Sequence, residues 1–179
     1  MTKYLLASLL AAATASQTYA QHPQPGQADA LAPSGPYAPY DWLIGDWSSK
    51  AGIRELITYG PRRSYIRFSA FVPGADGSEH LHFEGIALWN AKTRMLDYLF
   101  ALEPGSGAQE NGTYRAEADG TIIREVELIN ARGGTGTFRQ TFRKTGPNTA
   151  VTSVMRQTDQ GWVPTFPGGE RIELERKPS

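Results

Sequence analysis

Apolar side chains recur at every second position from Asp46 to the end of the chain, in short segments. Successive side chains of a β-strand point to opposite faces, so this period predicts strands rather than helices. Gly, Pro, Asn and Asp residues, which favour turns, separate the segments. The predicted strands span residues 46–50, 53–59, 64–72, 79–90, 95–103, 109–116, 121–130, 134–144, 149–157, 161–163 and 170–176.

Links of hairpin length join these segments, which predicts an antiparallel meander. No helical pattern of useful length follows Ile44. An open meander of about ten strands exposes two edges, and closure into a barrel removes both of them. The sequence therefore predicts an all-β fold, an antiparallel meander closed into a barrel of roughly ten strands. A two-sheet sandwich is the structural alternative.

The segment 41–47 reads Asp-Trp-Leu-Ile-Gly-Asp-Trp and precedes the first strand. We expect a short helical turn over residues 37–44 that ends at Gly45, because glycine accepts positive φ at little cost. Trp42 and Trp47 are large apolar anchors whose indole N–H groups need partners. We expect them to plug one end of the barrel, with a place in the wall of a ligand cavity as a further role for Trp47.

The N-terminal residues have the pattern of an export signal. Lys3 is followed by an apolar stretch, residues 4–15, and by Thr18-Tyr19-Ala20. We expect a cleavable signal peptide over 1–20, a flexible linker over 21–39 and a barrel domain over 40–179. The apolar stretch is shorter than the about 20 residues of a membrane span. These features predict a soluble periplasmic or secreted protein without stable membrane insertion.

Charge and cysteine usage exclude several classes of function. The 18 basic residues balance the 18 acidic ones, so no bulk field favours nucleic acid, and we expect no nucleic acid partner. The chain has no cysteine, which excludes thiol catalysis, thiolate metal sites and iron–sulfur clusters.

Alternation places mostly aliphatic and aromatic side chains inside the barrel, with Tyr98, Arg124, Gln140 and Ser153 as polar exceptions. An apolar cavity with few polar groups is typical of a small-ligand site. The candidate ligand-binding residues are Trp47, Trp89, Tyr98, Arg124, Phe138, Gln140 and Phe142. A buried guanidinium needs a partner. Arg124 is expected either to form an internal salt bridge or backbone cap, or to bind a ligand carboxylate.

Three short motifs carry a resemblance to a known group of proteins: Trp42–Trp47, Phe83–Asn90 and Asn111-Gly112-Thr113-Tyr114. Together they resemble an uncharacterised bacterial family that is similar to the nitrobindins and, more distantly, to the lipocalins and fatty-acid-binding proteins. These are the calycin-like barrels. The resemblance runs from about Asp41 to Arg176. It implies a barrel with an internal cavity for a small, largely apolar molecule.

One departure from that pattern concerns haem. Nitrobindins hold haem iron through a histidine near the C-terminal end, and no histidine follows His82 in this chain. We therefore expect neither haem nor any other cofactor.

Other chemical patterns have simpler structural explanations. His80, His82 and Glu84 alternate on one strand, so they would form a row of metal-ligand types. The row would face solvent if Phe83 faces the core, and we expect no metal there. The pairs Glu125/Glu127 and Glu173/Glu175 alternate with apolar residues, as solvated outer faces do.

Because no nucleophile, metal set or acid–base dyad stands out, we expect a binding protein rather than an enzyme. The predicted ligand is a small apolar or amphipathic molecule, with a carboxylate as one possibility, held inside the barrel. One alternative is a cavity enzyme for proton transfer or isomerisation in which Arg124 and Tyr98 polarise the substrate. A second alternative is a solidly packed barrel that acts only through interactions in the cell envelope.

Overall fold

The computed structural model describes residues 35–103 and 105–178. The predicted signal peptide and residues 21–34 of the predicted linker lie outside this range. The described residues form a mostly β structure with two short 3₁₀ helices, which confirms the predicted fold class. The elements are η1 (Gly35–Leu43), β1 (Gly45–Ser49), β2 (Arg54–Tyr59), η2 (Pro61–Arg63), β3 (Ile66–Pro73), β4 (Glu79–Asn90), β5 (Met95–Leu102), β6 (Gln109–Ala116), β7 (Ile122–Ile129), β8 (Thr135–Lys144), β9 (Thr149–Thr158), β10 (Gly161–Pro164) and β11 (Ile172–Arg176).

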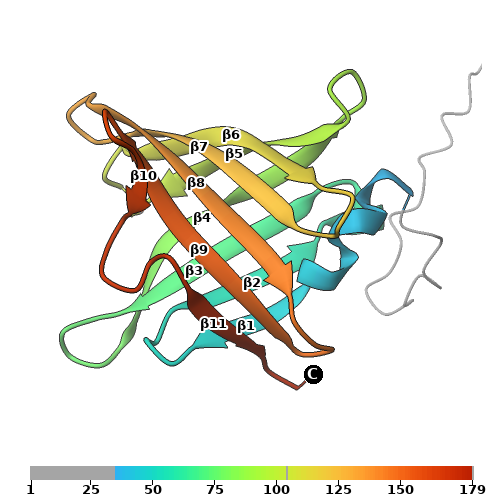
Figure 1. The fold of residues 1–179 in the computed structure, drawn as a ribbon, viewed down its shortest axis with the longest axis horizontal. Helices are drawn as coiled ribbons and strands as arrows, with labels where there is room; N and C mark the ends of the chain where they lie inside the picture. The colour runs from blue at the N-terminus through green and yellow to red at the C-terminus, as the bar shows by residue number, and fades with distance from the viewer. Residues whose placement is uncertain (1–34, 104, 179) are drawn as a thin grey trace, which may run out of the picture. The chain divides into compact units, whose positions relative to one another are not determined.

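The strands close into an antiparallel barrel (Figure 1). Strands β1 to β8 pair in chain order, β8 pairs with β9, and β11 pairs with both β9 and β1. Ten strands of the described residues thus form the closed wall, and β10 adds only to the second half of β9. The barrel prediction is confirmed over the sandwich alternative.

Burial follows the alternation that the sequence predicted. In β5, for example, Leu96, Tyr98, Phe100 and Leu102 are buried while the residues between them are exposed. The bounds of the observed strands differ from the predicted ones by two residues or fewer. No helix in the described part of the chain has both the length and the apolar character of a membrane-spanning helix.

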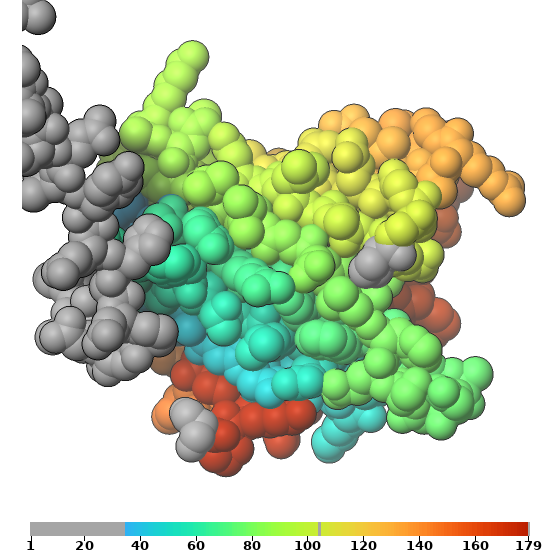
Figure 2. All heavy atoms as spheres, turned by 180° about the vertical axis from the view of Figure 1, so that it is seen from behind, coloured from blue at the N-terminus to red at the C-terminus, as the bar shows by residue number. Residues whose placement is uncertain are grey.

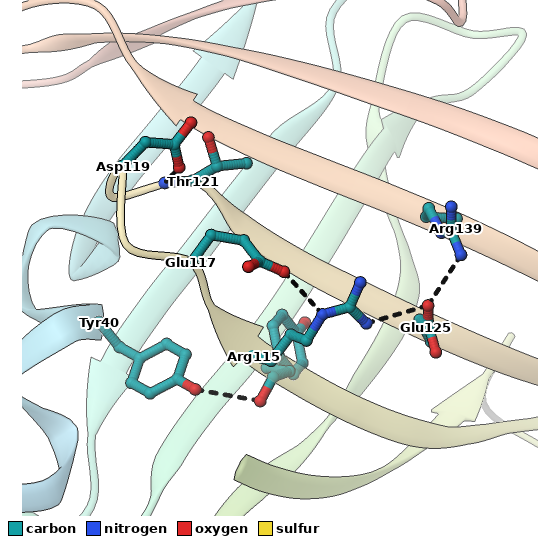
Figure 3. Close-up of polar contacts among 8 residues, drawn as sticks. Tyr40, Arg115, Glu117, Asp119, Thr121, Glu125 and Arg139 are labelled. Atoms are coloured by element: carbon teal, nitrogen blue, oxygen red, sulfur yellow. Dashed lines mark hydrogen bonds and ion pairs between the residues drawn. The ribbon is translucent and has the colours of Figure 1, made fainter. Parts of the chain in front are cut away.

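Helix η1 closes one end of the barrel, where it lies beside the strand ends (Figure 1). Its residues Tyr37, Tyr40 and Leu43 are buried, so residues 35–39 of the predicted linker belong to the packed domain instead. The Tyr40 hydroxyl donates a hydrogen bond to the Tyr114 carbonyl at 3.0 Å (Figure 3), and burial raises the pKa of Tyr40 to about 12. The helix ends before Gly45, whose φ is 150°.

The outer face of the barrel carries charge pairs. Glu125 on β7 accepts from Arg115 of β6 at 3.0 Å and from Arg139 of β8 at 2.9 Å (Figure 3). The hydrogen bond from Arg115 lowers the pKa of Glu125, and the side chain stays 43% exposed. Glu125 therefore lies on the solvated face, as predicted. Seen from behind, the outer surface over β3, β4 and β5 is a continuous layer of atoms (Figure 2).

A β-bulge interrupts the pairing of β3 with β4. Ala70 pairs with Phe83, but its neighbour Phe71 pairs with Leu81, which leaves His82 as an extra residue. A bulge changes which side chains point to which face. The predicted row of His80, His82 and Glu84 on one face is consequently wrong.

Candidate functional site

The interior of the barrel contains a cavity of about 350 Å³. None of its lining residues comes from η1, whereas Thr165 and Phe166 come from the segment between β10 and β11. Most of the lining side chains are apolar, and five of the polar ones form one connected group. The lining residues are Ile53, Glu55, Ala70, Val72, His82, Phe83, Glu110, Arg124, Val126, Leu128, Phe138, Gln140, Thr152, Val154, Thr165, Phe166, Ile172 and Leu174.

Three of the seven predicted site residues line this cavity: Arg124, Phe138 and Gln140. The other predicted residues point into the barrel but lie outside the lining. Phe142 and Trp47 border the tightly packed region next to η1, and the amide of Trp89 donates to the Tyr37 hydroxyl at 3.1 Å. Alternation thus identified these residues correctly as inward-facing. However, Trp47, Trp89 and Phe142 lie at the end of the barrel that is packed against η1.

Arg124 is held by its own surroundings. Its Nη2 forms an ion pair with the Glu110 carboxylate, and its Nη1 donates to Gln140 Oε1 at 2.8 Å. Its side chain is only 4% exposed. The internal salt bridge expected as one role for Arg124 is therefore confirmed. Its guanidinium also lies 5.0–5.9 Å from the centroids of four rings, which are Phe83, Tyr98, Phe100 and Tyr114.

Gln140 connects Arg124 to a second carboxyl group. Its Nε2 donates to Glu55 Oε1 at 3.3 Å and to Thr152 Oγ1 at 3.2 Å. Glu55 lies on β2 and is buried. Burial raises the pKa of the Glu55 carboxyl, and the charge of Arg124 and the Gln140 hydrogen bond offset part of that effect. A polar group of Glu55, Glu110, Arg124, Gln140 and Thr152 thus lies within the apolar cavity.

Tyr98 lies beside this polar group without lining the cavity. Its hydroxyl donates to the Glu125 carbonyl at 3.2 Å, and its ring centroid is 5.0 Å from the Arg124 guanidinium carbon. Gly112 of the Asn-Gly-Thr-Tyr motif makes room for this contact. A Cβ at Gly112 would lie 1.9 Å from the Glu125 carbonyl oxygen and 3.2 Å from Tyr98, and the residue has φ of 152°. The motif therefore has a structural reason.

The bulge in β4 places His82 in the cavity lining, next to Phe83. His82 and Glu110 also line an outer groove with Ser106 and Arg132, so they stand where the interior meets the surface. Phe166 lines the cavity while 40% exposed, which marks a second part of the mouth.

Two further expectations about polar residues changed. The structure places Ser153 on the outer face, hydrogen-bonded to Thr141, and Thr152 faces inward in its place. Glu84 forms an ion pair with Arg67 at 3.1 Å, away from His82. The described residues contain no group of three potential metal ligands.

Sequence reasoning missed Glu55 and Glu110, although each had a signal. Glu55 alternates with Ile57 on β2 and with Ile53 just before it, and Glu110 alternates with Gly112 and Tyr114 on β6. In both strands the apolar neighbours at the second position face inward, so the carboxyl group between them does too.

The comparisons with known proteins leave the site to be interpreted from its geometry. No family model matches the chain, and no curated protein is significantly similar to it in sequence.

Replacing Glu55 with glutamine is expected to stabilise the empty barrel increasingly as pH rises. The folded-state pKa of Glu55 is raised above the unfolded value of about 4.3, so the neutral form is favoured in the fold. The stability associated with that form is fully present below the unfolded pKa and is lost as pH rises towards the folded pKa. Glutamine keeps the hydrogen bond with Gln140 and cannot ionise.

Melting temperatures of the wild type and the Glu55→Gln variant between pH 4 and pH 8 test this expectation. The difference in favour of the variant should widen with pH. Glu127→Gln, an exposed change on β7, is the control and should show no such trend. A constant difference across the range would mean that the pKa of Glu55 is the same in the folded and unfolded states.

Proposed function

We propose that this protein binds a small, largely apolar molecule inside the barrel, with one polar end of the ligand against the group around Glu55. The observation that carries the proposal is the cavity of about 350 Å³, with mostly apolar walls and the polar group of Glu55, Glu110, Arg124, Gln140 and Thr152. Small-molecule sites have volumes of about 300–1,000 Å³ and this same division between apolar walls and a few polar groups.

The polar end of the ligand is better matched by a hydrogen-bond donor than by a carboxylate. Arg124 already forms an ion pair with Glu110 and donates a hydrogen bond to Gln140, so its positive charge is neutralised within the protein. Glu55 faces the same cavity as an acceptor. A ligand carboxylate would bring a further negative charge to a site in which Glu110 already pairs with the one guanidinium.

The two alternative functions fit the geometry less well. A barrel that acts only through its surface needs no interior cavity. The proton-transfer enzyme considered above needs Tyr98 and Arg124 to polarise its substrate, and both groups already make hydrogen bonds within the protein.

The proposal includes export, because residues 1–20 have the pattern of a signal peptide. The protein would then bind its ligand in the periplasm or outside the cell.

Filling the cavity should abolish binding. Val154 on β9 lines the cavity, and Val154→Phe would add a ring to its interior. We expect straight-chain alcohols from butan-1-ol to octan-1-ol to bind the wild type and to lose about tenfold or more in affinity with the variant. Isothermal titration calorimetry measures the affinities, and native mass spectrometry of the purified wild type searches for a molecule already bound.

Val151→Phe is the matched control, because the same substitution on the same strand lies three residues away and therefore on the opposite face. It should bind the alcohols as the wild type does. If no alcohol binds the wild type and its native mass is that of the polypeptide alone, the proposed function is wrong.

A further inference from the structure

The charges inside the cavity do not balance. Among the lining residues that the structure describes, Glu55 and Glu110 carry carboxyl groups and Arg124 carries the guanidinium, with no lysine. If both carboxyls are ionised, the polar group has a net charge of −1. A buried net charge is costly unless a counter-charge or a proton neutralises it.

Arg124 is paired more closely with Glu110 than with Glu55. The ion pair to Glu110 is direct, whereas Glu55 is reached through Gln140. The hydrogen bond from Gln140 to Glu55 is 3.3 Å long, and the described residues provide no other hydrogen bond to this carboxyl group. Glu55 is therefore the group whose charge is least compensated by the protein.

The rings around Arg124 add to this asymmetry. Phe83, Tyr98 and Phe100 surround the guanidinium at 5.0–5.1 Å, with Tyr114 at 5.9 Å. Their faces stabilise the cation where it is. Glu55 lies instead on the lining beside apolar side chains such as Ile53 and Ala70.

We propose that the cavity selects amines: the ligand is a small apolar molecule with a protonated primary amine that binds the Glu55 carboxylate. This inference rests on the proposed function and names the chemical class of its ligand. The ammonium group supplies the positive charge that the lining residues lack. It also donates hydrogen bonds to an acceptor that has one long hydrogen bond from the protein.

Amine binding by this site should release a proton. Glu55 takes up a proton more readily than an exposed carboxyl because it is buried, and binding an ammonium requires its ionised form. Amine affinity should therefore increase from pH 5 to pH 8, where a primary amine with a pKa near 10.4 remains protonated. The other ionisable groups around the cavity are Glu110 and Tyr114 of β6, Arg124 of β7, Tyr98 of β5 and His82 of β4 at the mouth.

Hexylamine, hexan-1-ol and hexanoate test the inference, because they share a chain and differ only in the polar end. In calorimetric titrations at pH 7.5 we expect hexylamine to bind about tenfold or more tightly than hexan-1-ol, and hexanoate to bind most weakly. Repeating the hexylamine titration in two buffers of different ionisation enthalpy measures the protons released.

Glu55→Gln should lower hexylamine affinity about tenfold or more, leave hexan-1-ol affinity within about threefold, and remove the pH dependence. Glu127→Gln is the control. It removes an exposed carboxyl on the outer face of β7 and should change none of these values. If hexan-1-ol binds and hexylamine binds no better, or if Glu55→Gln leaves amine affinity unchanged, the inference is overturned while the proposed function stands. If none of the three compounds binds, the inference is overturned, and the proposed function falls with it when the native mass is that of the polypeptide alone.

Discussion

Replacing Arg124 with leucine is expected to lower the free energy of unfolding by about 3–5 kcal/mol at pH 7. The substitution removes the partner of Glu110, whose side chain is only 12% exposed, and the positive charge nearest to Glu55, which is buried. Leaving a buried charge without its partner costs far more than the pair itself contributes. At roughly 3 °C per kcal/mol for a domain of this size, the melting temperature should drop by about 10 °C or more.

The pH dependence identifies the cause of this loss. Without Arg124, the folded-state pKa of each carboxyl rises, so its cost disappears when pH falls below the unfolded value of about 4.3 and grows as pH rises above it. Arg124→Leu should therefore be closest to the wild type near pH 4. Thermal unfolding monitored by circular dichroism at pH 4, 5.5 and 7 measures the trend.

Two further variants separate charge from packing. Arg139→Leu is the same substitution on β8, but Arg139 is 35% exposed on the outer face, so we expect a loss below about 1 kcal/mol. Combining Arg124→Leu with Glu110→Leu removes both members of the ion pair and should recover part of the stability. Equal losses from Arg124→Leu and Arg139→Leu, or strictly additive losses in the double variant, would show that the interior pair has no special role.

The alternation of apolar residues predicted the fold because each strand of a barrel has one face buried in the interior and one face exposed to solvent. The period of two in β5 and β7 places Leu96, Phe100 and Val126 inside, and the short turns pair consecutive strands from β1 to β9. These features are local in sequence, so local patterns were sufficient to predict them.

The site was only partly predictable, because alternation determines the face of a residue and not its height along the barrel axis. Trp89 and Phe142 point inward like Phe138, yet they lie at the end that η1 fills. Height depends on how each strand is staggered against its neighbours, and this register arises only when the sheet closes. The predicted cavity residues were therefore split between the plug and the cavity.

The inward position of His82 and that of Glu55 were not predicted, for two different reasons. A bulge adds one residue to one strand, so His82 changed face without any change in the pattern of apolar residues. Glu55 shares its face with Ile57, but a charged residue within an apolar row has to be explained by partners on other strands. Gln140 is 85 positions away in sequence, and only the closed barrel brings it to Glu55.

Trp47→Ala is expected to cost about 3–5 kcal/mol of stability. The side chain is 1% exposed, its Nε1–H donates to the Leu43 carbonyl at 2.7 Å, and the Trp42 ring contacts it edge-on with centroids 6.3 Å apart. The guanidinium carbon of Arg176, on the last strand, lies over the Trp47 ring, 4.5 Å from its centroid. Removing the indole would thus leave a hole where η1, β1 and β11 meet. Urea unfolding followed by circular dichroism measures the loss.

The same variant separates the two roles expected for Trp47. The residue borders the packed region beside η1 and does not line the cavity, so a folded Trp47→Ala protein should bind hexan-1-ol with wild-type affinity. Trp162→Ala is the control, because Trp162 lies on β10 outside the closed wall, where it contacts Arg139, and its loss should cost about 1 kcal/mol. A stable Trp47→Ala protein with weakened binding would place this tryptophan in the ligand site and not in the plug. A destabilised protein with unchanged binding would establish that one end of the barrel serves stability and the other serves the ligand.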